Sequence, residues 1–174
     1  KEFGLAAGLA DTTKTTANVH RVQILDPAVG TGTFISAVIR KIYERLIKRN
    51  QKGTWPSYVH HDLLPRLHGF ELMMAPYAVG HLKMSFLLEE LGYKLQTDDR
   101  FKLYLTNTLE MEELAQTELP GMASLSEESH LAGKVKKEQP ILVILGNPPY
   151  SVSSANKSDF IEEEMNVYKK DVRN

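Results

Sequence analysis

The chain has 174 residues, a formal net charge of −1 and a hydrophobic content of 42%, the balance of an ordinary globular domain with a core of its own. It contains no cysteine, so disulfides and thiolate metal sites are excluded. The near-zero charge argues against a strongly basic nucleic-acid surface. No apolar stretch could span a bilayer and no secretory signal opens the sequence, so we expect a cytoplasmic protein with no membrane partner.

Short apolar runs alternate with helical patterns, which predicts an α/β fold with part of a doubly wound parallel sheet. We expect one partial domain over residues 1–174 and, because the sequence begins at Lys1 rather than methionine, further chain in the natural protein. The expected elements are a connector at 1–20, a strand at 22–26, a helix at 33–49, a long connection at 50–65, a strand at 67–71, a helix at 75–91, a strand at 101–106, a polar connection at 111–140 containing a helix at 126–137, a strand at 141–145 and a tail helix at 158–174.

The first strand runs into a glycine turn and a helix, the geometry of a nucleotide-type cofactor site. Gly30 and Gly32 permit positive φ and close approach of a ligand to the backbone. The turn lacks the glycine spacing of a dinucleotide site and the lysine of a phosphate loop. The carboxylate of Asp26 would repel a pyrophosphate but suits an ammonium group, which points to S-adenosylmethionine. The residues expected to line this part of the site are Asp26, Pro27, Ala28, Gly30, Thr31, Gly32, Thr33 and Phe34.

The ends of the next two strands supply the other expected cofactor contacts. Glu71 could accept hydrogen bonds from both ribose hydroxyls, and Leu72 could pack against an adenine ring. The gap from the glycine turn to Glu71 is about forty residues instead of the usual twenty or so, because the connection at 50–65 intervenes. Asn107 follows the next strand with a side-chain carbonyl that can accept a hydrogen bond, and Thr108 and Leu109 lie on the same wall. The alternatives are a solvated strand-end charge and a plain turn residue.

Asn147, Pro148, Pro149 and Tyr150 follow the continuous apolar run at 141–145, which predicts a strand buried in a parallel sheet. Open α/β sheets bind ligands where such strands end. The Asn147 carbonyl can accept from an amino group, the prolines stiffen the turn, and Tyr150 offers a face on which a base could stack. These groups suit an exocyclic amino group and its ring. The alternative is a Pro-Pro turn with Tyr150 packing at its rim.

The segment at 26–34 resembles motif I of the amino-group DNA methyltransferases, and the segment at 147–150 resembles their motif IV. Their order is similar to that of the N6-adenine enzymes of the gamma arrangement. The sequence resembles in particular the methylase region of the Type ISP single-polypeptide restriction-modification enzymes, with support from 76–83, 105–109 and 146–151. The resemblance implies a Rossmann-like class I S-adenosylmethionine-dependent methyltransferase fold.

The same resemblance implies methyl transfer to the N6 amino group of an adenine flipped out of double-stranded DNA, with recognition segments outside this chain. Asn147, Pro148, Pro149 and Tyr150 would form the catalytic segment. C5-cytosine methylation is disfavoured because it requires a cysteine. Two other hypotheses remain open: methylation of a different substrate, such as a protein glutamine, and a cofactor-binding region without activity of its own.

The sequence predicts no metal site. Adjacent residues in a proline-flanked segment, such as His60, His61 and Asp62, do not make a tetrahedral site by themselves.

Overall fold

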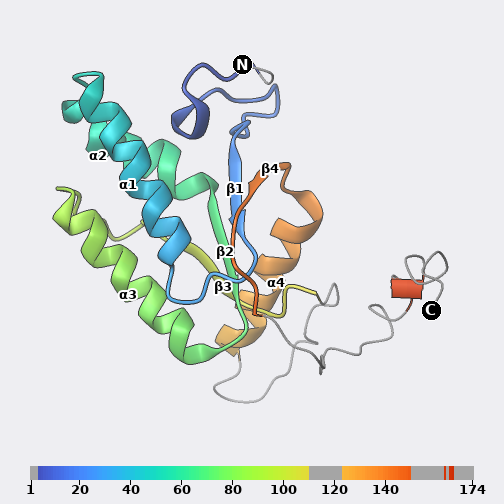
Figure 1. Ribbon diagram of the computed structural model, residues 1–174. Helices are drawn as coiled ribbons and strands as arrows, with labels where there is room; N and C mark the ends of the chain where they lie inside the picture. The colour runs from blue at the N-terminus through green and yellow to red at the C-terminus, as the bar shows by residue number, and fades with distance from the viewer. Residues whose placement is uncertain (1–3, 110–122, 150–162, 164, 167–174) are drawn as a thin grey trace.

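The computed structural model describes residues 4–109, 123–149, 163, 165 and 166. Its centre is a parallel sheet of four strands in the order β3-β2-β1-β4 (Figure 1). In register, Asp26 of β1 aligns with Gly69 of β2, and Leu25 aligns with Ile144 of β4. The strands are β1 (Gln23–Asp26), β2 (Leu67–Glu71), β3 (Lys102–Leu105) and β4 (Ile141–Ile144).

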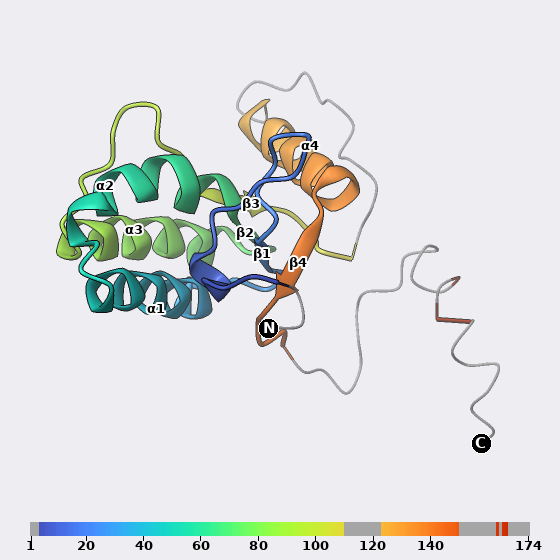
Figure 2. The same ribbon diagram turned by 90° about the horizontal axis from the view of Figure 1, so that it is seen from above.

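Helices cover both faces of the sheet (Figures 1 and 2). One face carries α1 (Thr33–Lys48), α2 (Trp55–Tyr58) and α3 (Met74–Glu90), and the other carries α4 (Ala123–Glu138). Short turns of other helix types lie at Gly8–Ala10, Lys52–Thr54, Val59–Leu63 and Leu64–Arg66. This layering confirms the predicted α/β class. Within the described part of the chain, no helix has the length and apolar character needed to cross a membrane.

The predicted strands and helices within the described residues are confirmed, with ends that differ by at most three residues. The connection expected at 50–65 instead contains α2 and adjoining helical turns. Trp55, Val59 and Leu63 of this segment bury their side chains in the main core, so burial orders it. The expected tail helix at 158–174 lies outside the described residues except at three positions.

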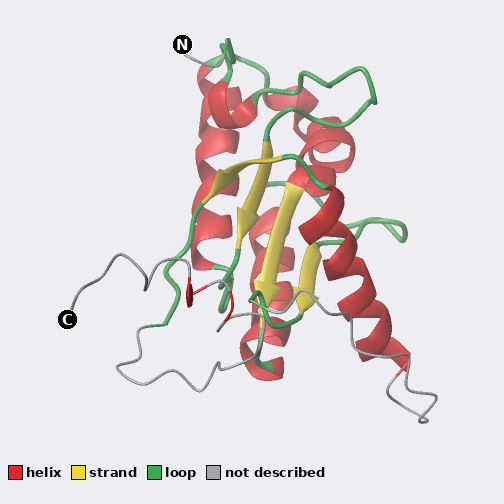
Figure 3. Ribbon diagram, turned by 90° about the vertical axis from the view of Figure 1, so that its right-hand side faces the viewer, coloured by secondary structure: helices red, strands yellow, loops and turns green. Residues whose placement is uncertain are grey.

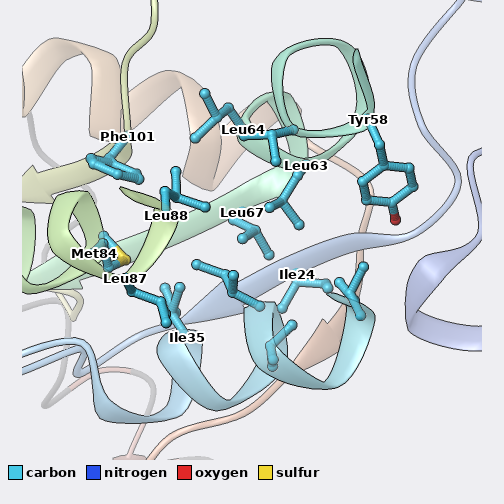
Figure 4. Close-up of a cluster of buried hydrophobic side chains, with 14 of the residues drawn as sticks. Ile24, Ile35, Tyr58, Leu63, Leu64, Leu67, Met84, Leu87, Leu88 and Phe101 are labelled. Atoms are coloured by element: carbon cyan, nitrogen blue, oxygen red, sulfur yellow. The ribbon is translucent and has the colours of Figure 1, made fainter. Parts of the chain in front are cut away.

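The main hydrophobic core lies between the sheet and the helices α1, α2 and α3 (Figure 4). Ile24 of β1, Ile35 of α1 and Leu88 of α3 are fully enclosed there. Each such side chain stabilises the fold by about 1.5–3 kcal/mol relative to an exposed one. A smaller cluster on the other face packs α4 against β2 and β3. Its buried members are Phe70, Tyr104, Ala132 and Val135.

The expectation that β4 is buried on both faces is wrong for the described residues. Val143 packs against the main core, whereas Leu142 is 41% exposed and Ile144 is 68% exposed. Successive side chains of a strand point to opposite faces. The smaller cluster under α4 is built mainly on β2 and β3, which leaves these two side chains of β4 uncovered by described residues.

Gly69 of β2 allows the turn after β1 to lie close to the sheet. A Cβ at this position would be 2.5 Å from Leu103 Cδ2 and 3.1 Å from Val29 Cβ. We expect Gly69→Ala to lower the free energy of unfolding by about 1–3 kcal/mol through overpacking, measured by urea denaturation. Gly53→Ala is the control, because a Cβ there meets nothing within 4 Å. Equal stability of the two variants would contradict the packing argument.

Candidate active site

The parallel strands point their carboxyl ends to one edge of the sheet (Figure 3), and the predicted site residues that the structure describes lie at or just after these ends. The glycine turn follows β1, Glu71 ends β2 and the segment around Asn107 follows β3. The segment that begins at Gly146 follows β4 and lies against the start of the glycine turn. The structure therefore assembles segments that are far apart in the sequence at the edge where such sheets bind ligands.

The glycine turn has the backbone geometry that the sequence predicts. Gly30 and Gly32 have φ values of 54° and 77°, and Gly32 is the N-cap residue of α1. Val29 N–H donates to Phe70 O of β2 at 2.9 Å, which ties the turn to the sheet. Gly80 of α3 supports the turn from the other side, since a Cβ there would be 3.3 Å from Gly30 O. The turn is thus held by the sheet and a helix.

The remaining turn residues lie around this backbone. Thr31, Thr33 and Phe34 are exposed, and Pro27 and Ala28 are half-buried. Thr33 and Phe34 belong to the first turn of α1, where backbone N–H groups have no partner within the helix. These positions are accessible to a ligand.

Glu71 is bonded to the turn and is not simply a solvated charge. Gly30 N–H donates to its Oε2 at 2.9 Å, and Met73 N–H donates to its Oε1 at 2.8 Å. Each carboxylate oxygen keeps a further lone pair. The side chain is therefore held beside the glycine turn with acceptor capacity to spare. Its contact with a ribose stays a prediction.

Asp26 is fully buried at the end of β1. Its Oδ1 accepts a hydrogen bond from Ala28 N–H at 3.1 Å, while Oδ2 has no hydrogen-bond partner among the described residues. Burial raises the pKa of Asp26; the Ala28 hydrogen bond lowers it, and the negative charge of Glu71 raises it further. A buried carboxylate oxygen without a donor fits a ligand that brings a positive charge.

The segment after β3 folds back towards β1. Asn107 Oδ1 accepts from Leu109 N–H at 3.1 Å, so this carbonyl already stabilises a turn. Thr108 Oγ1 donates to Pro27 O. Lys136 of α4 donates to Thr106 Oγ1 at 3.1 Å and to Asn107 O at 2.6 Å. The segment is fixed beside the glycine turn, and the role of Asn107 towards adenine stays a prediction.

Lys136 is a site-shaping residue that sequence reasoning missed. In the sequence it stands in a lysine-containing stretch that is typical of a solvated helix face. The structure half-buries it, with its ammonium 5.4 Å from the Phe70 ring centroid. The packing of α4 over β2 and β3 creates this arrangement, and no local motif signals it.

Apolar side chains stand exposed around this edge. Phe34 is 44% exposed, Leu72 66% and Leu109 51%. Asn147, Pro148 and Pro149 are exposed as well, and Leu145 N–H donates to Leu25 O at 3.0 Å just before them. Tyr150 lies outside the described residues. The edge offers apolar surface together with fixed polar groups, as ligand sites do.

The run His60-His61-Asp62 does not converge on one point. His60 Nδ1 lies 2.8 Å from Asp99 Oδ1, and Asp62 Oδ1 lies 2.9 Å from His20 Nε2. His61 Nδ1 contacts Ser57 O at 3.0 Å. These neighbours in sequence face three different partners.

A cleft of about 570 Å³ lies away from the strand ends, between residues 7–13 and the end of α1. Arg45 and Arg49 line it together with Asp11 and Asp62. The mixture of charges favours no single class of ligand there.

The fold and the turn after β1 define a protein with a Rossmann-like methyltransferase fold. The structure of the ATP-dependent Type ISP restriction-modification enzyme LlaBIII bound to DNA is similar over 97% of this chain, with a TM-score of 0.66 and 23% sequence identity. The nuclease-deletion mutant of the Type ISP enzyme LlaGI in complex with a DNA substrate mimic is 26% identical, with a TM-score of 0.56 over 84% of this chain.

The sequence model of the family described as the MmeI DNA-methyltransferase domain matches residues 8–174, and the chain belongs to this family. The Type II methyltransferase M.BstVI of Geobacillus stearothermophilus is 29% identical over 76 residues, which are 44% of this chain. The DrdV–DNA complex is similar over 85% of the chain, with 26% identity and a TM-score of 0.55. The chain spans 13% of M.BstVI and 11–13% of these structural relatives.

Asp26 generates a prediction about stability and pH. Because folding raises the pKa of Asp26 above its ordinary value of 3.8, the cost of burying the charge is absent below pH 3.8 and is complete above the pKa of the folded state. We expect Asp26→Asn to be more stable than the parent at pH 7 by about 1–3 kcal/mol, because a neutral group replaces the buried charge. The advantage should shrink as the pH falls towards 3.8. Urea unfolding at a series of pH values measures this, and an advantage independent of pH would contradict it.

Lys136 generates a second prediction. We expect Lys136→Met to lower the free energy of unfolding by about 1–3 kcal/mol, because two acceptors after β3 lose a charged donor. The exposed Lys134, on the same helix, provides the matched control, and Lys134→Met should stay within about 0.5 kcal/mol of the parent. Thermal and urea unfolding compare the two. A Lys136→Met variant as stable as the control would show that these hydrogen bonds do not hold the segment.

Proposed function

We propose that this chain carries the methyl-transfer centre of a DNA methyltransferase that modifies the N6 amino group of adenine, within a restriction-modification protein. One observation carries the proposal. The segment Asn147-Pro148-Pro149, suited to an amino group on a ring, lies next to the turn that begins at Asp26. This neighbourhood occurs in a chain that belongs to a DNA-methyltransferase family.

S-adenosylmethionine is the proposed cofactor, and it would supply a methyl group on a sulfonium that is already a good leaving group. Asp26 Oδ2, a buried oxygen without a hydrogen-bond partner among the described residues, would accept its ammonium group, and Glu71 would accept bonds from its ribose. Leu72 is the exposed apolar surface for its adenine, with Asn107 and its neighbours beside it. The proposed cofactor residues are Asp26, Pro27, Ala28, Gly30, Thr31, Gly32, Thr33, Phe34, Glu71, Leu72, Asn107, Thr108 and Leu109.

On the substrate side, the chain's task is to hold a base outside the duplex, where N6 is otherwise buried in the stack and the base pair. Asn147 Oδ1 and Pro148 O would accept hydrogen bonds from the two N–H groups of N6. These bonds favour a pyramidal nitrogen whose lone pair points at the methyl group. Tyr150 would stack on the base. The rate advantage comes from positioning and electrostatics, and no covalent adduct with the protein is needed.

Double-stranded DNA is the proposed macromolecular partner. The similar LlaGI structure is a complex with a DNA substrate mimic, and the similar DrdV structure is a complex with DNA. A net charge of −1 gives this chain little attraction for phosphates by itself, so recognition segments elsewhere in the natural polypeptide would supply most of the affinity. Such an enzyme acts where the genome is, in the cytoplasm. The family match favours DNA over a protein glutamine.

The test uses the full-length natural polypeptide with methyl-labelled S-adenosylmethionine and duplex DNA, followed by digestion to nucleosides and mass spectrometry. We expect the label in N6-methyldeoxyadenosine. Asn147→Ala should lower kcat by on the order of 10²-fold, since it removes one positioned acceptor, while the cofactor dissociation constant stays within about threefold, as uniform binding is untouched. Gln51→Ala, which removes an exposed amide in the connection after α1, is the control.

Each other outcome contradicts a definite part of the proposal. Label in N4-methylcytosine would overturn the adenine assignment, and label on protein would support the glutamine alternative. Cofactor binding without any methylated product would identify a cofactor-binding region with no activity of its own. No cofactor binding by the folded polypeptide would overturn the assignment of Asp26 and Glu71.

A further inference from the structure

Gly146 forms the contact between the two halves of the proposed site. It immediately precedes Asn147, and it packs directly on the residue that ends β1. A Cβ at position 146 would lie 2.6 Å from Asp26 Oδ1 and 3.3 Å from Pro27 Cδ. The first distance is below any that real Cβ atoms tolerate, so one of the two segments would have to move.

The backbone conformation does not explain the glycine. Gly30 and Gly32 have positive φ, and a Cβ at Gly30 would meet nothing within 4 Å, so glycine at position 30 is explained by conformation. Gly146 is not among the glycines with positive φ. Its need for glycine arises from the close approach to Asp26 and Pro27, and the contact with Asp26 is the shorter of the two.

The side chain of Asp26 cannot easily move away from a Cβ at position 146. It is fully buried, and its Oδ1, the atom that a Cβ would meet, accepts the Ala28 N–H bond at 3.1 Å. On the other side of the contact, β4 is anchored to β1, because Leu145 N–H donates to Leu25 O at 3.0 Å. A side chain at position 146 would therefore push residues 147–149 away from the turn or disturb the carboxylate beneath them.

We propose that Gly146 is a positioning residue that sets the distance between the Asn147 amide and the turn that holds the methyl donor. This inference rests on the proposed function. In physical terms, one small residue fixes the position of residues 147–149, which would hold the amino group, relative to the turn after β1, which would hold the methyl donor. A misplacement of about 1 Å can cost on the order of 10²-fold in rate even where binding is little changed.

The experiment measures single-turnover methylation by the full-length polypeptide at saturating S-adenosylmethionine, so that altered cofactor affinity does not enter the rate. We expect Gly146→Ala to lower this rate at least tenfold, with KM for DNA changed less than threefold. Gly53→Ala, whose Cβ meets nothing within 4 Å, should keep the parent rate. A parent-like rate for Gly146→Ala would overturn the inference while leaving the proposed function intact.

A double-mutant cycle tests whether Gly146 acts through Asp26. Asp26→Ser removes the atom at 2.6 Å and leaves the Cγ position at 3.5 Å and Pro27 Cδ at 3.3 Å, which a shift of a few tenths of an ångström accommodates. In that background Gly146→Ala should cost less than twofold. Asp26→Asn keeps an atom at the Oδ1 position, so there the full loss should persist. An equal loss in all three backgrounds would overturn the inference.

A second readout is independent of turnover. Duplex DNA with 2-aminopurine in place of the target adenine becomes fluorescent when the base leaves the stack. We expect Gly146→Ala to keep at least half of the fluorescence increase that the parent gives. We also expect its dissociation constant for S-adenosylmethionine to stay within threefold of the parent's. Loss of both signals would mean that the variant is damaged as a whole and would overturn a positioning role. Absence of N6-methyladenine from the parent's product would refute the proposed function itself.

Discussion

The bond from Gly30 N–H to the Glu71 carboxylate is the interaction on which the rest of the site depends. It joins the turn after β1 to the end of β2. A second hydrogen bond, from Val29 N–H to Phe70 O, joins the same two segments. With the turn fixed there, Gly32 can begin α1 at the edge of the sheet. The same junction keeps two carboxylates, Asp26 and Glu71, close to each other, and the first turn of α1, at Thr33 and Phe34, offers backbone N–H groups to a ligand.

The proximity of these two carboxylates destabilises the charged form of Asp26. The pKa of Asp26 is raised by burial and also by Glu71, and its Oδ2 finds no donor among the described residues. Functional sites are where such perturbed groups gather. A fold selected only for stability would place a neutral or apolar residue here. A bound cation would therefore offset the cost of the buried carboxylate at this edge of the sheet.

The order and type of the main elements could be predicted because apolar runs mark β1 and β4 and because α1 carries its apolar residues at helical spacing. The helical turns between Lys52 and Arg66 could not, since prolines and mixed helix types blur any single period. The site was predicted residue by residue at the strand ends. The burial of Asp26 under Gly146 and the reach of Lys136 to Asn107 were not, because both arise from elements that meet only in the folded chain.

The close packing of Gly80 against Gly30 O limits the directions from which a ligand can reach the turn after β1. With α3 behind the turn and β2 beside it, the turn cannot move towards either of them. A small molecule would then reach it from the open side, past Phe34 and Leu72, both of which are exposed. A spent molecule would leave by the same route, so exchange of one for the other would proceed without any rearrangement of the sheet.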